Sequence, residues 1–174
     1  MKKNAWIAAL AALALTGCGT KVPPKGIRAV ADFDLGTYLG TWHEIARMDH
    51  SFERGLEQVR AEYSRNADGT VRVVNTGYDP VKMKWKTAVG RARFAGAANV
   101  ASLEVSFFGP FYGGYHVFAL EPGEYALVTG GTRAYLWLLA RGKSLSPEGT
   151  GALLREAAAA GFDTNALVWV KQDE

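Results

Sequence analysis

Apolar and polar residues alternate in short segments along most of this chain, and each segment ends in turn residues. Side chains two positions apart share one face of a β-strand, so this alternation is typical of strands with one buried face. The connections are short, and Asp68-Gly69 is a strong hairpin signal, which favours antiparallel neighbours. The predicted strands cover residues 42–48, 59–64, 70–76, 87–94, 101–107, 115–120, 125–129 and 135–141.

Consecutive antiparallel strands expose the fewest edges when they close into an up-and-down barrel. A short turn is expected at residues 35–39, before the first strand. A helix is expected at 147–160, because a serine hydroxyl can cap it, a proline suits its first position and Gly161 can end it. Its apolar stripe requires a buried surface, most simply the outside of the barrel. We therefore predict an all-β, eight-stranded antiparallel barrel with a C-terminal helix packed outside and a short final strand at 166–171.

The amino-terminal residues follow a different pattern. Lys2 and Lys3 precede an apolar run at residues 5–15, which is shorter than the roughly 20 residues that a membrane-spanning helix needs. Leu15-Thr16-Gly17-Cys18 then resembles a bacterial lipobox, whose processing leaves acyl chains on the cysteine. The alternative is an ordinary secretion signal with a chance cysteine.

Cys18 is the only cysteine, so it has no disulfide partner within the chain, and a free thiol in an oxidising compartment is a liability. Two or more acyl chains on this residue would hold the protein firmly to a membrane. Pro23 and Pro24 favour an extended backbone after it. The predicted organisation is a cleaved signal peptide at 1–17, a lipid anchor and tether at 18–33, and a folded domain at 34–174.

The net charge gives little support for an acidic partner. Removing Lys2 and Lys3 with the signal lowers the formal charge of +3 by two, to +1. Lysines at 82, 84 and 86 and arginines at 91 and 93 are read as a solvated strand face, with a headgroup-binding patch as the alternative. The chain has no phosphate-binding loop or dinucleotide-binding glycine pattern, and we expect no nucleic-acid partner.

Several motifs, in order along the chain, resemble the lipocalin family. They are the segment 38–64 with Gly40-Thr41-Trp42, the segment 105–117, residues 125–128, and the strand that ends at Arg141. With the lipobox they resemble bacterial outer-membrane lipocalins, and the glycine after Cys18 lacks the aspartate that marks inner-membrane retention in such lipoproteins. One departure is the turn Glu121-Pro122-Gly123-Glu124, which replaces the usual Thr-Asp before Tyr125. The resemblance implies that Trp42 closes the narrow end of the barrel with Arg141 over its ring, a structural clamp stabilised by cation–π attraction.

The alternation predicts which side chains line the interior. With Trp42 inward, Glu44 shares its face, whereas Arg60, Arg72 and His116 point outward. Several inward residues are small, which leaves volume for a ligand, and a few carry hydroxyl or amide groups that could orient it. The predicted ligand-binding residues are Ala46, Ala61, Tyr63, Val73, Asn75, Phe94, Val105, Phe107, Tyr115, Val117, Val128, Tyr135 and Trp137. The other inward positions are Met48, Val59, Val71, Gly90, Ala92, Leu103, Ala119, Ala126 and Leu139.

Signals for catalysis are weak. There is no Gly-x-Ser-x-Gly motif, and His43, His50 and His116 lack metal-ligand spacing, so we expect no enzyme, metal or cofactor. The apolar lining predicts an apolar ligand of moderate size. The resemblance implies fatty acids or lysophospholipids, bound by a protein attached to the outer membrane through Cys18 and facing the periplasm. A structural envelope lipoprotein and a lipid-modifying enzyme are the alternatives, and the sequence sets no oligomeric state.

Overall fold

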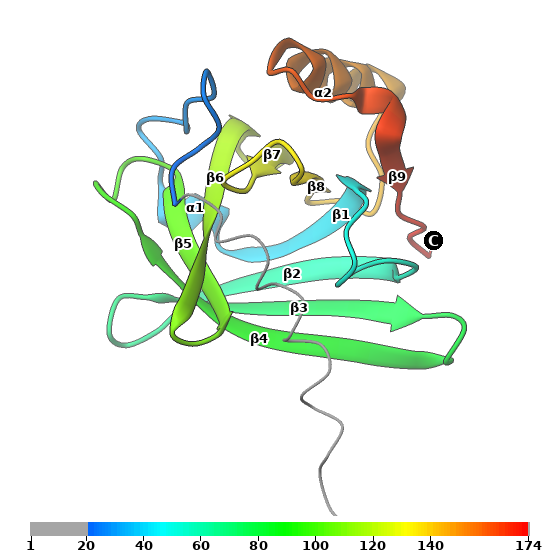
Figure 1. Ribbon diagram of the computed structural model, residues 1–174, viewed down its shortest axis with the longest axis horizontal. Helices are drawn as coiled ribbons and strands as arrows, with labels where there is room; N and C mark the ends of the chain where they lie inside the picture. The colour runs from blue at the N-terminus through cyan, green and yellow to red at the C-terminus, as the bar shows by residue number, and fades with distance from the viewer. Residues whose placement is uncertain (1–20, 174) are drawn as a thin grey trace, which may run out of the picture.

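The structure is a computed structural model that describes residues 21–173, so the predicted signal peptide and Cys18 lie outside the described residues. Eight antiparallel strands follow the spatial order β2-β3-β4-β5-β6-β7-β8-β1, and pairing of β1 with β2 closes the barrel (Figure 1). The predicted fold class is therefore confirmed. The strands are β1 (Gly40–Met48), β2 (Glu57–Arg65), β3 (Val71–Asp79), β4 (Lys84–Phe94), β5 (Ser102–Phe108), β6 (Phe111–Glu121), β7 (Tyr125–Thr129) and β8 (Leu136–Ala140).

Four strands begin earlier than the alternation predicts, and β4 and β6 do so by the most residues. β4 begins at Lys84 instead of residue 87, and β6 begins at Phe111 instead of residue 115. Near these turns apolar residues are exposed, as at Trp85, which is 49% exposed, and Val89, which is 52% exposed. Without a buried face the period-two pattern fades, although the backbone pairing continues.

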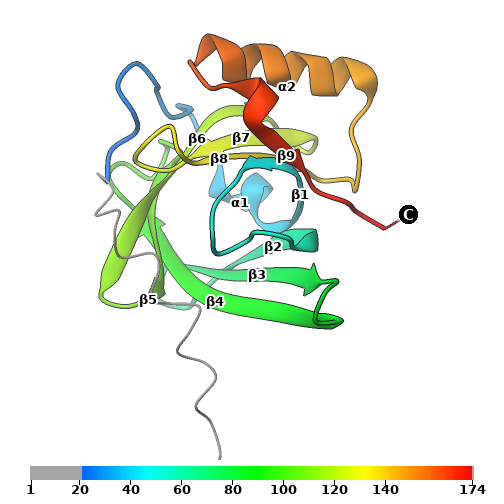
Figure 2. The ribbon, with the colours of Figure 1, turned by 45° about the vertical axis from the view of Figure 1, so that its right-hand side comes forward.

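A short helix, α1 (Leu35–Tyr38), closes one end of the barrel and is seen within the ring of strands in Figure 2. Asp34 caps it, because its carboxylate accepts a hydrogen bond from the Gly36 N–H at 2.8 Å. Leu35 and Tyr38 are buried in the inner apolar cluster. The indole N–H of Trp42 donates to the Tyr38 carbonyl at 2.8 Å, which fixes the helix to the first strand.

Arg141 lies across the closed end. Its guanidinium carbon is 3.9 Å from the centroid of the fully buried Trp42 ring, the contact that the family resemblance implies. Its N–H groups also donate to the carbonyls of Thr37 at 2.6 Å, Leu39 at 2.9 Å and Thr41 at 2.8 Å. One side chain therefore joins the end of β8 to α1 and to the start of β1.

The helix α2 (Pro147–Ala159) packs against the outside of the barrel, as Figure 2 shows. The Ser146 hydroxyl accepts from the Gly149 N–H at 3.0 Å, which caps the first turn. Leu153 and Ala157 are fully buried in an outer apolar cluster with residues of β7 and β8. In the part of the chain that the structure describes, no helix combines the length and apolar character needed to cross a bilayer.

A final strand, β9 (Leu167–Trp169), follows the 3₁₀ turn η2 (Thr164–Ala166) and pairs with β1. β1 therefore pairs with β2, β8 and β9 along different parts of its length. Beyond β9, the Gln172 side-chain amide donates to the carbonyls of Glu44 at 2.8 Å and Val59 at 3.0 Å. The end of the described chain thus joins β1 to β2.

Residues 21–33, most of the expected tether, lie against the barrel. The Val30 N–H donates to the Val117 carbonyl at 2.9 Å, and the Val30 carbonyl accepts from the Ala101 N–H at 2.9 Å. Arg133 donates to the Lys25 carbonyl at 2.8 Å. Ile27 is buried against the outer cluster. This segment buries apolar surface that the sequence pattern did not reveal.

Two register shifts change which residues face the interior. One falls between Glu44 and Ala46 in the β1–β8 pairing, and the other between Val117 and Ala119 in the β6–β7 pairing. A bulge adds a residue to one strand, so alternation beyond it is reversed. The predicted inward orientation is therefore wrong for Ala46, Met48 and Ala119, which belong to the outer cluster beneath α2.

Candidate ligand site inside the barrel

The inner apolar cluster unites most of the predicted lining. Buried side chains form its centre, and half-buried ones complete it. The predicted ligand-binding residues in this cluster are Ala61, Tyr63, Val73, Phe94, Val105, Tyr115, Val117, Val128 and Trp137. The alternation thus identifies a continuous interior surface formed by residues of β2 to β8.

Four of the predicted residues lie elsewhere or only partly in the interior. Ala46 is in the outer cluster because of the β1 bulge. Phe107 is 43% exposed, and its ring lies so close to Gly90 that a Cβ added there would be 2.8 Å from it. Tyr135 is half-buried and stacks on Trp137 at 5.9 Å. Asn75 is half-buried, and its buried Oδ1 has no hydrogen-bond partner among the described residues.

Three tyrosine hydroxyls meet in the interior, near the end that α1 closes. Tyr115 Oη lies 2.6 Å from Tyr38 Oη and 2.8 Å from Tyr63 Oη. Burial raises the pKa of each of these phenols above the usual 10, so all three stay protonated at neutral pH. Two hydrogen bonds among three hydroxyls use two of the three protons. The third proton is a donor that an oxygen-bearing ligand could accept.

A buried charged group lies farther along β1. Arg47 donates to the Glu44 carboxylate at 2.7 Å and to the Glu53 carbonyl at 2.7 Å. All three residues are at most 7% exposed. Burial raises the pKa of both glutamates, and proximity to Glu53 raises that of Glu44 further, while Arg47 opposes both shifts. One guanidinium therefore stabilises two buried carboxyl groups, and its Nε has no partner among the described residues.

The connection between β1 and β2, residues 49–56, we call the lid loop. The His50 ring stacks on Phe52 with centroids 4.1 Å apart and lies 5.2 Å from the Trp137 ring. Trp137 donates its indole N–H to the Glu53 carboxylate at 3.1 Å. Burial lowers the pKa of His50 to about 4, so the ring is neutral at neutral pH. The lid loop is thus fixed to β8 at the end of the barrel opposite Arg141.

Part of the interior is accessible to solvent. Ala61, Val105 and Tyr115 belong to the inner cluster but are only half-buried. Ala88 is opposite Asn75 in the β3–β4 register and is exposed, although it lies on the inner row of β4. The interior therefore keeps accessible apolar surface on β2, β4, β5 and β6.

Sequence reasoning missed Arg47, Glu53 and Tyr38. Arg47 faces the interior because of the β1 bulge, whereas strict alternation puts it outside. Glu53 lies in a loop, where periodicity gives no orientation. The sequence signal that could have found Arg47 was Glu44. Glu44 was predicted to face the interior, and a buried carboxylate requires a partner. Among the described residues, no group of three His, Cys, Asp or Glu side chains is arranged to hold a metal ion.

Comparison with known proteins agrees with this geometry. Residues 33–172 match the family described as a lipocalin-like domain. The outer membrane lipoprotein Blc of Citrobacter freundii is 49% identical over 166 residues, which cover 95% of this chain and 94% of that protein. The Vibrio cholerae protein of the same name is 46% identical, covering 94% of this chain and 95% of its own length.

A solved structure shares the fold at lower sequence identity. Insecticyanin from the tobacco hornworm Manduca sexta superposes with a TM-score of 0.71 at 20% identity, covering 88% of this chain and 89% of that one. This similarity bears on the fold alone. The much closer Blc proteins are named outer membrane lipoproteins, which supports an outer-membrane location.

Proposed function

This chain belongs to the lipocalin family, and from that premise we propose that it binds and carries fatty acids, lysophospholipids or similar small lipids in the cell envelope. In this proposal Cys18 is acylated, and the barrel is held at the outer membrane facing the periplasm. Family membership supports a binder of small molecules. The choice of lipids depends on the interior.

The observation that carries the proposal is the separation of apolar and polar groups inside the barrel. The walls are apolar side chains of the inner cluster. Polar groups gather at two places, the tyrosine hydroxyls around Tyr115 and the buried ions around Arg47. A pocket with apolar walls and few polar groups suits a ligand with a long apolar part and a small polar end. A single-chain amphiphile has this form.

The polar end is assigned to the Arg47 side of the site. A guanidinium with a free N–H can bind a carboxylate or phosphate oxygen, whereas the tyrosine hydroxyls are neutral. The acyl chain would then lie along Ala61 and Val105, where the apolar surface is accessible. Entry requires the lid loop to shift, which breaks the contacts of His50 and Glu53 with Trp137 and the hydrogen bond from Arg47 to the Glu53 carbonyl.

The test is a titration that compares two matched phenylalanine variants of protein purified without its acyl anchor. Ala61→Phe places a ring inside the barrel, and Thr87→Phe places the same ring on an exposed strand position. A lysophospholipid should saturably change tryptophan fluorescence of the wild type and of Thr87→Phe. Ala61→Phe should bind at least tenfold more weakly, about 1.4 kcal/mol. Folded Ala61→Phe that binds like the wild type would place the ligand outside the barrel.

Two further readouts separate a binder from a structural lipoprotein and from an enzyme. A binder gains thermal stability from ligand, by about 2.7 kcal/mol at a hundredfold excess over Kd, whereas a structural lipoprotein gains none. Turnover of a lysophospholipid ester would identify an enzyme. Native mass spectrometry of the purified protein would name any co-purifying lipid directly.

A further inference from the structure

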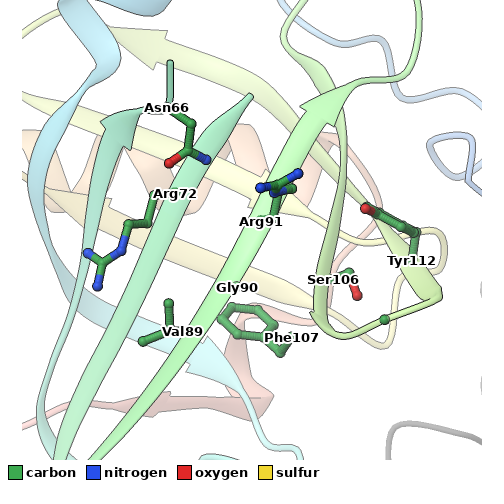
Figure 3. A pocket seen from close by; sticks show the side chains of 9 residues that line it. Asn66, Arg72, Val89, Gly90, Arg91, Ser106, Phe107 and Tyr112 are labelled. Carbon is green, nitrogen blue, oxygen red and sulfur yellow. The ribbon is translucent and has the colours of Figure 1, made fainter. Parts of the chain in front are cut away.

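A groove of about 500 Å³ lies beside β3, β4 and β5, lined by the outward side chains of Arg72 and Arg91 and by Gly90 and Phe107 (Figure 3). Arg72 and Arg91 are on adjacent strands in the groove wall, with Ser106 and Tyr112 across from them. Pairing of β4 with β5 covers only residues 91–94 of β4, so the two strands separate beyond Arg91. The groove lies where this separation begins.

The two arginines form an unfavourable pair. Arg72 and Arg91 are direct partners in the β3–β4 register, and like charges at such positions destabilise a sheet. Arg91 has an ion pair with Asp68 at 3.1 Å, but both side chains are about half exposed. Among the ion pairs between described residues, none includes Arg72. An anion between the two guanidinium groups would replace repulsion with attraction.

A buried donor also lines the groove. Ser106 pairs with Arg91 across β4 and β5 and is only 8% exposed, yet its buried hydroxyl has no partner among the described residues. Its neighbour Tyr112 is fixed because the Arg93 guanidinium lies 4.2 Å from the ring centroid. The exposed side chains of Val89 and Phe107 provide an apolar border. Two cations, a hydroxyl donor and an apolar border fit a phosphate group attached to an apolar body.

The start of the described chain lies close to this groove. Lys21 forms an ion pair at 3.3 Å with Glu104, which is two residues before Ser106 on β5 and hence on the same face, roughly 7 Å along the strand. Cys18 is three residues before Lys21 in the sequence, and three residues of chain span at most about 11 Å. If Cys18 is acylated, as the proposed function requires, the membrane headgroups lie within reach of the groove.

We infer that this groove binds the phosphate headgroup of an anionic phospholipid in the membrane that holds the anchor. Arg72 and Arg91 bind the phosphate oxygens, Ser106 donates a hydrogen bond, and the border contacts the glycerol and first acyl carbons. The charged groups of this second site, Arg72 and Arg91, are separate from Arg47 and Glu44 of the interior site. The location of the groove relative to the membrane depends on the proposed anchor, whereas its chemistry does not.

The test is calorimetric titration of the full chain in a nonionic detergent with short-chain lipids. Dihexanoyl phosphatidylglycerol should bind saturably and at least fivefold more tightly than dihexanoyl phosphatidylcholine, which has the same chains but a zwitterionic headgroup. Arg72→Gln and Arg91→Gln should each weaken the phosphatidylglycerol complex at least fivefold. Arg155→Gln removes the same charge from an exposed position on α2, and should leave the affinity within twofold of the wild type.

Two additional titrations distinguish a headgroup site in the groove from a free-phosphate site and from binding inside the barrel. Inorganic phosphate should compete weakly with phosphatidylglycerol, and competition at equal strength would make the groove a free-phosphate site instead. Ala61→Phe, which obstructs the interior, should leave phosphatidylglycerol binding intact even if lysophospholipid binding fails. Loss of both ligands in Ala61→Phe, or equal binding by Arg72→Gln and the wild type, would overturn the inference. Thermal unfolding of each variant verifies that it is folded.

Discussion

The contact between Trp42 and Arg141 can be measured with a double-mutant cycle. Trp42→Ala removes a fully buried indole, which should cost about 3 to 5 kcal/mol of unfolding free energy. Arg141→Ala removes three hydrogen bonds to carbonyls and a cation–π contact. Because Arg141 is partly exposed, water can replace some of these bonds, and a cost of about 2 to 3 kcal/mol is expected.

The double variant should cost less than the sum of the single variants, by about 1 to 2 kcal/mol, because the two side chains are in contact. Urea unfolding monitored by circular dichroism gives each free energy, provided that the m value is unchanged. Arg141→Lys is the informative control, since an ammonium group keeps the charge but cannot reproduce the planar fork. It should recover less than half of the loss. Strict additivity would show that the guanidinium and the indole do not interact energetically, and the clamp interpretation would then fail.

Three other outcomes are expected. His50 has a folded-state pKa of about 4 against 6.5 in the unfolded chain. The free energy of unfolding should therefore fall by up to about 3 kcal/mol as the pH drops from 6.5 to 4. His50→Phe keeps an aromatic ring without a titrating group, so urea unfolding of this variant should show a flatter dependence on pH in that range. Tyr115→Phe leaves two hydroxyls without partners and should cost about 1 to 3 kcal/mol more than Tyr38→Phe, which leaves Tyr115 bonded to Tyr63; equal losses in urea unfolding would contradict the hydroxyl network. Cys18→Ser should abolish acylation and membrane fractionation, whereas wild-type protein recovered as soluble material with a free thiol would refute the proposed anchor.

The barrel could be predicted from the sequence because apolar and polar residues alternate along its strands. Most strands keep one buried face, and the capping residues Ser146 and Gly161 mark a helix regardless of what it packs against. Trp42 and Arg141 were identified through family resemblance, since no periodicity pairs residues that far apart. The interior was predicted well for Val71 and Val73 on β3 and for Ala92 and Phe94 on β4, because the pairing of these two strands has no register shift.

The errors come from bulges and loops. An extra residue in β1 turns Ala46 outward and Arg47 inward, but a bulge has no fixed composition and so leaves no mark in the pattern. Glu53 gains its role from Trp137, a contact between a loop and a strand distant in sequence. Such long-range contacts decide where the polar groups of the site lie. Alternation predicted the apolar side chains that line the pocket but not its buried charged side chains.

The pairing of β1 with β8 and β9 also determines when the chain can fold. β1 is among the first elements made, yet two of its three partners come from the last forty residues, and Gln172 completes the bonding to Glu44 and Val59. Contacts between such distant residues form slowly, because the intervening chain loses entropy when its ends meet. The barrel therefore cannot close until β8, β9 and Gln172 have been made. A polypeptide that remains open until its C-terminal residues emerge is well suited to be threaded through a secretion channel before it folds.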